Sequence, residues 1–171
     1  GYQIVAYSDH ELIFDNSYLC DKDFVALTSS EYSLNSKTQK TIHLNLFSED
    51  PHNTFHIATG PKNIREYHVS KYAPNKIKYD GYNRTLTKES VQETIDRANK
   101  AGFLVQFNHP NWSLNTREDY IDLKGLWSLE ILNYMTEIET GAEYCINIYD
   151  DMLRHGHKLV CTMGDDNHNY H

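Results

Sequence analysis

The sequence predicts an α/β fold with parallel strands. Six short segments have the apolar or alternating pattern of strands, and amphipathic helical patterns lie between several of them. Strands that are apolar throughout are typical of parallel sheets, because helices cover both faces of such a sheet. The length of 171 residues fits one domain, so we expect residues 1–171 to form a single unit.

Each predicted strand is a short run of β-branched, aromatic or aliphatic residues that ends in polar residues. The first is apolar throughout and is expected to be fully buried. The third alternates polar and apolar residues, as a strand with two different faces does. The predicted strands cover residues 3–7, 24–28, 41–47, 103–107, 126–132 and 158–162.

Helices are predicted where apolar residues recur at helical spacing between a capping residue and a stop signal. Thr87 can cap a helix that ends at Gly102. A second helix is predicted to begin near Thr140 and to end before Gly156, and a shorter one follows Thr116.

Residues 52–86 form a polar, tyrosine-rich insertion without a clear helical pattern. Between Lys62 and Lys88 there are seven basic and two acidic residues in a chain whose net charge is −8. The insertion separates the strands that carry His43 and His109, so we expect it to project over the same end of the sheet. Arg65 and Arg84 are the candidate ligands for a substrate phosphate, because guanidinium groups bind phosphate through two parallel hydrogen bonds. The alternative is a solvated surface insertion whose lysines only confer solubility.

Composition excludes several classes of protein. The acidic charge argues against a polymeric nucleic-acid partner, which requires basic residues to displace counterions. No apolar run approaches the length of a membrane span, and the N-terminus does not resemble a signal peptide. The three cysteines form no Cys-x-x-Cys pair, which favours a reducing, cytoplasmic setting.

Potential metal ligands gather at the strand ends. Five of them follow the carboxyl end of a predicted strand, and the sixth, His43, lies near the start of the third. The carboxyl ends of parallel strands converge on one face, and imidazole and carboxylate groups there are typical of a transition-metal site. The six candidates are His10, Glu31, His43, His109, Asp166 and His168.

The order of these residues resembles the PHP (polymerase and histidinol phosphatase) domain family nearly end to end. Asp9-His10 is similar to its second motif, and Glu31 with His43 to its glutamate and following histidine. His109-Pro110 is similar to the third motif, and residues 164–168 to the fourth. The chain has no His-x-His motif or first-motif aspartate at its start, so it resembles a PHP fragment that is incomplete at the N-terminus.

The resemblance implies a distorted parallel (β/α) TIM-like barrel that binds up to three manganese, iron or zinc ions and hydrolyses phosphoesters. It implies one metal position on Glu31, His43 and His109. A second would use Glu31 and Asp166 together with the absent His-x-His motif, and a third would use His10 and His168 together with the absent aspartate. Asp9, Asp165, Glu130 and Asn133 are candidates to orient the histidines, although Asp9 could equally cap a turn.

We therefore expect a phosphoesterase that acts on a small phosphorylated metabolite. The alternatives are a non-catalytic PHP module that serves as an interaction or stabilising part of a larger protein, and an amidohydrolase-like metal enzyme.

Overall fold

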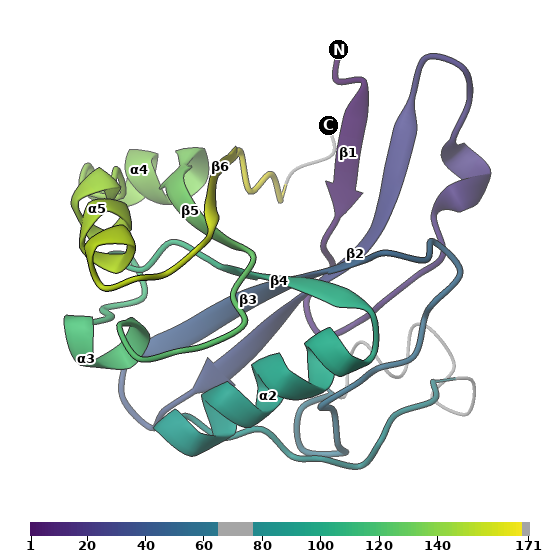
Figure 1. Ribbon diagram of the computed structural model, residues 1–171. Helices are drawn as coiled ribbons and strands as arrows, with labels where there is room; N and C mark the ends of the chain where they lie inside the picture. The colour runs from purple at the N-terminus through teal and green to yellow at the C-terminus, as the bar shows by residue number, and fades with distance from the viewer. Residues whose placement is uncertain (65–76, 169–171) are drawn as a thin grey trace.

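A curled, mixed six-stranded sheet organises the computed structural model, which describes residues 1–64 and 77–168 (Figure 1). The strands lie side by side in chain order. They are β1 (Ile4–Tyr7), β2 (Val25–Asn35), β3 (Thr41–Ser48), β4 (Phe103–Phe107), β5 (Ser128–Asn133) and β6 (Val160–Gly164). Each lies within a few residues of a predicted strand, except that β2 extends seven residues beyond the predicted end at Thr28.

The prediction of a parallel, TIM-like (β/α) barrel is wrong, because strands and helices do not alternate. β3 is antiparallel to both β2 and β4, whereas the other neighbouring strands are parallel. Residues 36–40 join β2 to β3 and are too few for a crossover between parallel strands. Only a 3₁₀ turn, Ser17–Leu19, stands between β1 and β2. The result is an open half-barrel.

The two faces of the sheet differ in chemistry. On β3, Ile42, Leu44 and Leu46 point into the hydrophobic core, and His43 and Asn45 point to the opposite face. The registers of β2, β4 and β5 continue this division, since Leu44 pairs with Tyr32 and Phe107, and Asn45 with Glu31 and Gln106. The candidate site lies on the polar face.

Helices cover the apolar side. α2 (Lys88–Lys100) begins at Thr87, whose side chain accepts a hydrogen bond from Ser90 N, and packs beneath the sheet in Figure 1. α3 (Arg117–Tyr120) follows Thr116, as predicted, and Thr116 N donates a hydrogen bond of 2.7 Å to Asp119 Oδ2. The predicted helix from Thr140 begins later, as α5 (Ile146–Arg154), and a separate α4 (Tyr134–Thr140) follows β5 directly.

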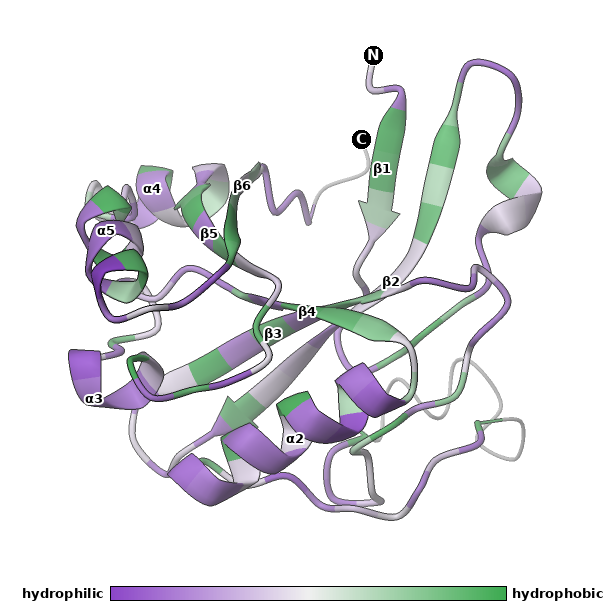
Figure 2. Cartoon of the chain, in the orientation of Figure 1, coloured by the Kyte–Doolittle hydropathy of each residue, from purple (hydrophilic) through white to green (hydrophobic). Residues whose placement is uncertain are grey.

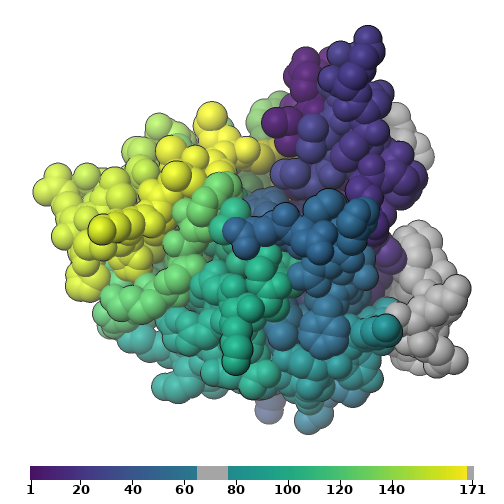
Figure 3. Space-filling model, turned by 45° about the vertical axis from the view of Figure 1, so that its right-hand side comes forward, coloured from purple at the N-terminus to yellow at the C-terminus, as the bar shows by residue number. Residues whose placement is uncertain are grey.

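The two edges of the half-barrel are apolar and accessible. The first strand is not fully buried as predicted, because β1 is an edge strand on which Ile4 is 63% exposed. β1 and the start of β2 are green in Figure 2, and Val25 and Leu27 are exposed there. In Figure 3 the purple N-terminal and yellow C-terminal segments rise on either side of the upper surface. None of the helices in the described residues is long and apolar enough to cross a membrane.

Candidate metal centre

The antiparallel β3 brings the centre together. Because β3 runs against its neighbours, its first residues lie beside the carboxyl ends of β2 and β4. His43 pairs with Ser33 of β2, and His43 O accepts a hydrogen bond of 3.0 Å from Asn108 N, immediately after β4. His43 therefore lies next to His109 although it stands at the opposite end of its own strand.

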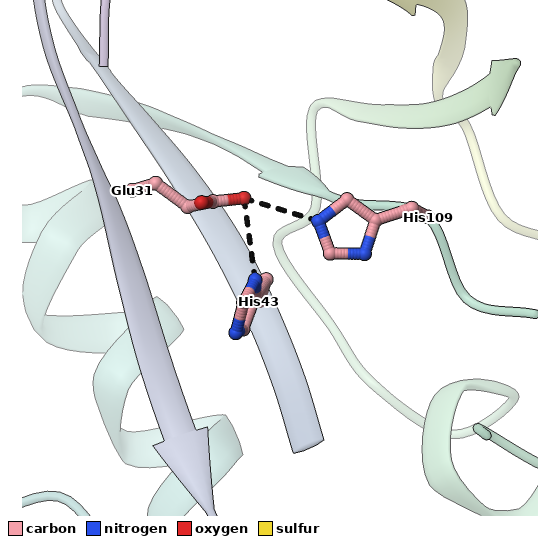
Figure 4. Close-up of side chains that lie close together, drawn as sticks. All are labelled: Glu31, His43 and His109. Atoms are coloured by element: carbon pink, nitrogen blue, oxygen red, sulfur yellow. Dashed lines mark hydrogen bonds and ion pairs between the residues drawn. The ribbon is translucent and has the colours of Figure 1, made fainter. Parts of the chain in front are cut away.

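Glu31, His43 and His109 form a buried group that could hold a metal ion, and their ligand atoms all lie within 4.8 Å of one another (Figure 4). Glu31 Oε1 lies 3.4 Å from His43 Nδ1 and 3.2 Å from His109 Nε2. Each of the three residues is less than 10% exposed. Two imidazoles and a carboxylate provide the three protein ligands of an open zinc-type site.

The other predicted ligands extend this cluster toward solvent. Glu31 Oε2 lies 3.1 Å from His10 Nδ1, so each oxygen of the carboxylate has its own histidines. His10 Nε2 lies 3.4 Å from His168 Nε2, and Asp166 Oδ1 lies 3.6 Å from His168 Nδ1. All six predicted residues thus belong to one connected group.

The chemistry of Glu31, His43 and His109 fits a bound cation, because hydrogen bonds among these residues do not satisfy all of their polar atoms. His43 Nδ1 is buried and has no hydrogen-bond partner, although it points at Glu31 Oε1. A buried nitrogen without a partner is costly unless something else satisfies it. A divalent ion between this nitrogen and the carboxylate would do so.

Polar side chains on the polar face of the sheet hold Glu31 in place. Asn108 Nδ2 donates a hydrogen bond of 2.7 Å to Glu31 Oε1. Asn108 Oδ1 in turn accepts from Gln106 Nε2, and Gln106 Oε1 accepts from Ser128 Oγ and from Thr162 Oγ1. This chain of bonds runs from β6 to the carboxylate.

His109 is held by both its backbone and its ring. Its N–H donates to Glu130 Oε2 at 3.1 Å, and its Nδ1 lies 3.0 Å from Ser113 Oγ. A proton on Nδ1 that is donated to Ser113 leaves the Nε2 lone pair facing Glu31. His109 and Asp166 also have positive φ angles of 24° and 49°, which non-glycine residues adopt mainly where surrounding contacts enforce them.

The candidates for orienting the histidines have different roles. Glu130 contacts His109 directly, and Asn133 Nδ2 donates both to Glu130 Oε2 and to Asp166 Oδ2. Asp165 accepts a hydrogen bond from Tyr2 Oη instead. Asp9 acts through its backbone, because its carbonyl accepts from Glu31 N.

Charge coupling sets the protonation of the metal-free centre. Burial acts to raise the pKa of Glu31, but the close contacts and positive charge of His109 and His43 outweigh it and hold this pKa well below the usual range. Burial acts to lower the pKa of His109, whereas the Glu31 carboxylate raises it above the usual value. The metal-free centre therefore favours an ionised Glu31, and a cation competes with the proton on His109.

Burial raises the pKa of Glu130 to about 7, so the folded protein favours its neutral form. Stability that this group contributes is present below its ordinary pKa of 4.5 and is lost as pH rises through about 7. In metal-free protein, Glu130→Gln should match wild-type stability near pH 4 and exceed it by about 3 kcal/mol near pH 8.

Denaturant unfolding of both proteins across this range checks the prediction. His56 also changes stability with pH, because burial lowers its pKa to about 4 and its contribution to stability increases as pH rises. This contribution is present in both proteins, so it cancels when the stability of one is subtracted from that of the other. A difference that does not change with pH would contradict the assignment to Glu130.

Of the two arginines predicted to bind phosphate, the structure places only Arg84, and Arg84 is not part of this cluster. Arg65 lies outside the described residues. The Arg84 side chain is fully buried, where it pairs with Glu11, donates to Ala58 O and stacks over the Tyr32 ring. Because its side chain is fully buried, Arg84 stabilises the fold and cannot reach a ligand at the surface.

The insertion also leaves the sheet at the other end from the site. Because β3 is antiparallel, its last residue, Ser48, lies beside Phe103 at the start of β4. The described part of the insertion then packs against the face that carries Tyr32, through Arg84, and His56 Nε2 accepts a hydrogen bond from Ile13 N. The expectation that it would project over the metal ligands is therefore not met by its described residues.

Several residues around the centre were not predicted. Asn108 directly precedes His109, and Ser113 follows it by four residues, so proximity in sequence was the available signal. Trp112 lies against both His43 and His109, with ring centroids 5.9 and 5.1 Å apart. The sequence does not indicate that Trp112 lies, partly exposed, beside the buried ligands, because this depends on the folded arrangement of the chain.

Comparisons with family models, with curated proteins and with solved structures found no match for this chain.

Proposed function

We propose that this protein is a metal-dependent hydrolase that cleaves phosphoester bonds of a small phosphorylated substrate. One observation carries the proposal: the buried Glu31 carboxylate directs one oxygen to His43 and His109 and the other to His10. A single carboxylate shared in this way suits the bridge between two adjacent cations, and adjacent cations are a recurring arrangement in phosphoryl-transfer enzymes.

The first ion would be held by Glu31, His43 and His109, and a second by Glu31, His10 and His168 with Asp166 nearby. Mixed imidazole and carboxylate ligands suit zinc, manganese or iron. Such ions, when bound, supply Lewis acidity for water activation and neutralise charge on phosphoryl oxygens.

The chain itself contributes orientation and access. Asn108 fixes Glu31, and Ser113 with Glu130 fixes His109, so the inner ligands are held before anything binds. Exposure then increases outward: the His43 side chain is 10% exposed, that of His10 27% and that of His168 52%. The residues of the second position are therefore more accessible than those of the first.

The test is a panel of phosphoester substrates with protein of measured metal content. Glu31→Gln should lower kcat/KM at least about 100-fold, because it removes the shared negative charge while keeping the shape. Glu118→Gln makes the same change at an exposed position and should leave kcat/KM unchanged. Equal turnover by wild type and Glu31→Gln would refute the proposal.

A second candidate is a metal-stabilised interaction module without catalysis. The exposed apolar residues along both sheet edges, among them Ile4 and Met163, favour this candidate, because they offer surface to a partner. Stoichiometric metal together with no hydrolysis of any substrate in the panel would select it.

A further inference from the structure

Trp112 is a large aromatic residue at the boundary between the buried ligands and solvent. Its ring lies edge-on to His109, with centroids 5.1 Å apart and planes at 82°, and it also contacts His43. His109 is 2% exposed and His43 8%, whereas Trp112 is 37% exposed. Trp112 is therefore a partly exposed residue in ring contact with two residues of the group that could hold a metal ion.

The indole is fixed on two sides. Trp112 N donates a hydrogen bond of 2.6 Å to Glu143 Oε2, and Nε1 donates one of 2.9 Å to Glu139 Oε2. Glu143 is fully buried, and Asn111 Nδ2 ties the same turn to Ala142 O. Both the backbone and the ring orientation are thus set by the segment that follows β5, the strand that also carries Glu130.

A ring fixed in this way is already organised for binding. Aromatic side chains add large contact area, and aromatic pairs at centroid distances of about 4.5–7 Å gain affinity beyond the area they bury. Little further entropy is lost when a ligand meets a ring that is already immobilised. A phosphoryl group bound to an ion on Glu31, His43 and His109 would bring the rest of the substrate within reach of the indole.

We propose that Trp112 is a specificity-determining residue that selects phosphoesters whose leaving group carries a planar ring. The proposal rests on the proposed phosphoesterase function, and it adds a class of substrate to it. Two observations favour it over a purely structural role: Trp112 is 37% exposed, and its ring contacts both His43 and His109.

The experiment compares benzyl phosphate with cyclohexylmethyl phosphate, which have similar size and alcohol leaving groups but differ in ring planarity. Trp112→Leu should lower kcat/KM for benzyl phosphate about 3- to 10-fold and leave that for cyclohexylmethyl phosphate unchanged. Metal content and thermal midpoint are measured on each variant, so that loss of metal or of folding is recognised.

Trp127→Leu is the matched control, because Trp127 is similarly exposed, at 38%, but packs on Phe47 rather than on the ligands. It should leave both rates at the wild-type value. Equal losses on the two esters with Trp112→Leu would overturn the proposal and make Trp112 a cover for the histidines.

Failure of the proposed function gives a different result, since wild type would then hydrolyse neither ester. Trp112 is in that case judged by calorimetric binding of benzylphosphonate to metal-loaded protein. Weaker binding by Trp112→Leu than by Trp127→Leu supports the selective role. Equal binding by the two variants, or no binding by wild type, overturns it.

Discussion

His43→Ala is expected to abolish binding of a divalent ion at the centre, with a loss of affinity greater than about 100-fold. Removing even a group that orients a metal ligand typically costs 10- to 100-fold, and His43 is one of only three groups in the buried set. Its Nδ1 lies 3.4 Å from Glu31 Oε1 without a hydrogen bond, so the substitution removes a candidate ligand atom and no hydrogen bond of Nδ1. Calorimetric titration of metal-free protein with Zn²⁺ and with Mn²⁺ measures the loss.

His52→Ala is the matched control for this substitution. The His52 side chain is 70% exposed and forms an ion pair with Asp15. Its loss should therefore leave metal affinity unchanged. Wild-type affinity in His43→Ala would contradict the ligand assignment. A comparable loss in both variants would indicate general binding to surface histidines.

Arg84→Met is expected to destabilise the protein by about 3–5 kcal/mol, because it leaves the Glu11 carboxylate buried without its counter-charge. The two side chains are 0% and 3% exposed, and Glu11 Oε1 also accepts a hydrogen bond from Ser33 N on β2. The pair therefore ties the end of the insertion to the segment that follows His10. Urea unfolding of metal-free protein measures the cost.

Arg154→Met provides the comparison, since Arg154 and Asp150 form an exposed ion pair whose side chains are 77% and 60% exposed. Its loss should cost less than about 1 kcal/mol. The opposite result for Arg84→Met, wild-type stability together with a higher KM for phosphorylated substrates, would restore the interpretation of Arg84 as a phosphate ligand.

The positions of the strands could be predicted, but their directions could not. Residues 29–35 are mostly polar, so they suggested the end of a strand, yet Ser29, Glu31 and Ser33 line the polar face of β2. A strand segment that is polar on the polar face of the sheet and partly polar on the other lacks the alternation of apolar residues by which a strand is predicted. Once β2 extends to Asn35, the short connection to Thr41 makes a hairpin, and a parallel barrel is no longer possible.

The six candidate ligands could be predicted although the direction of β3 could not. Glu31 was expected beyond the end of a strand and lies within one, and His43 was expected near a strand start and lies there. The reversed direction of β3 compensates for the first error, because it brings His43 to the carboxyl ends of β2 and β4. The role of Arg84 could not be predicted, since its partner Glu11 is distant in sequence and adopts a positive φ of 65°.

The most direct test of the metal centre is an anomalous difference map from crystals of this protein grown with Zn²⁺. The account predicts a peak about 2.0–2.2 Å from a Glu31 oxygen and from one nitrogen each of His43 and His109. No anomalous peak between these three residues, in crystals that bind zinc only elsewhere, would contradict it.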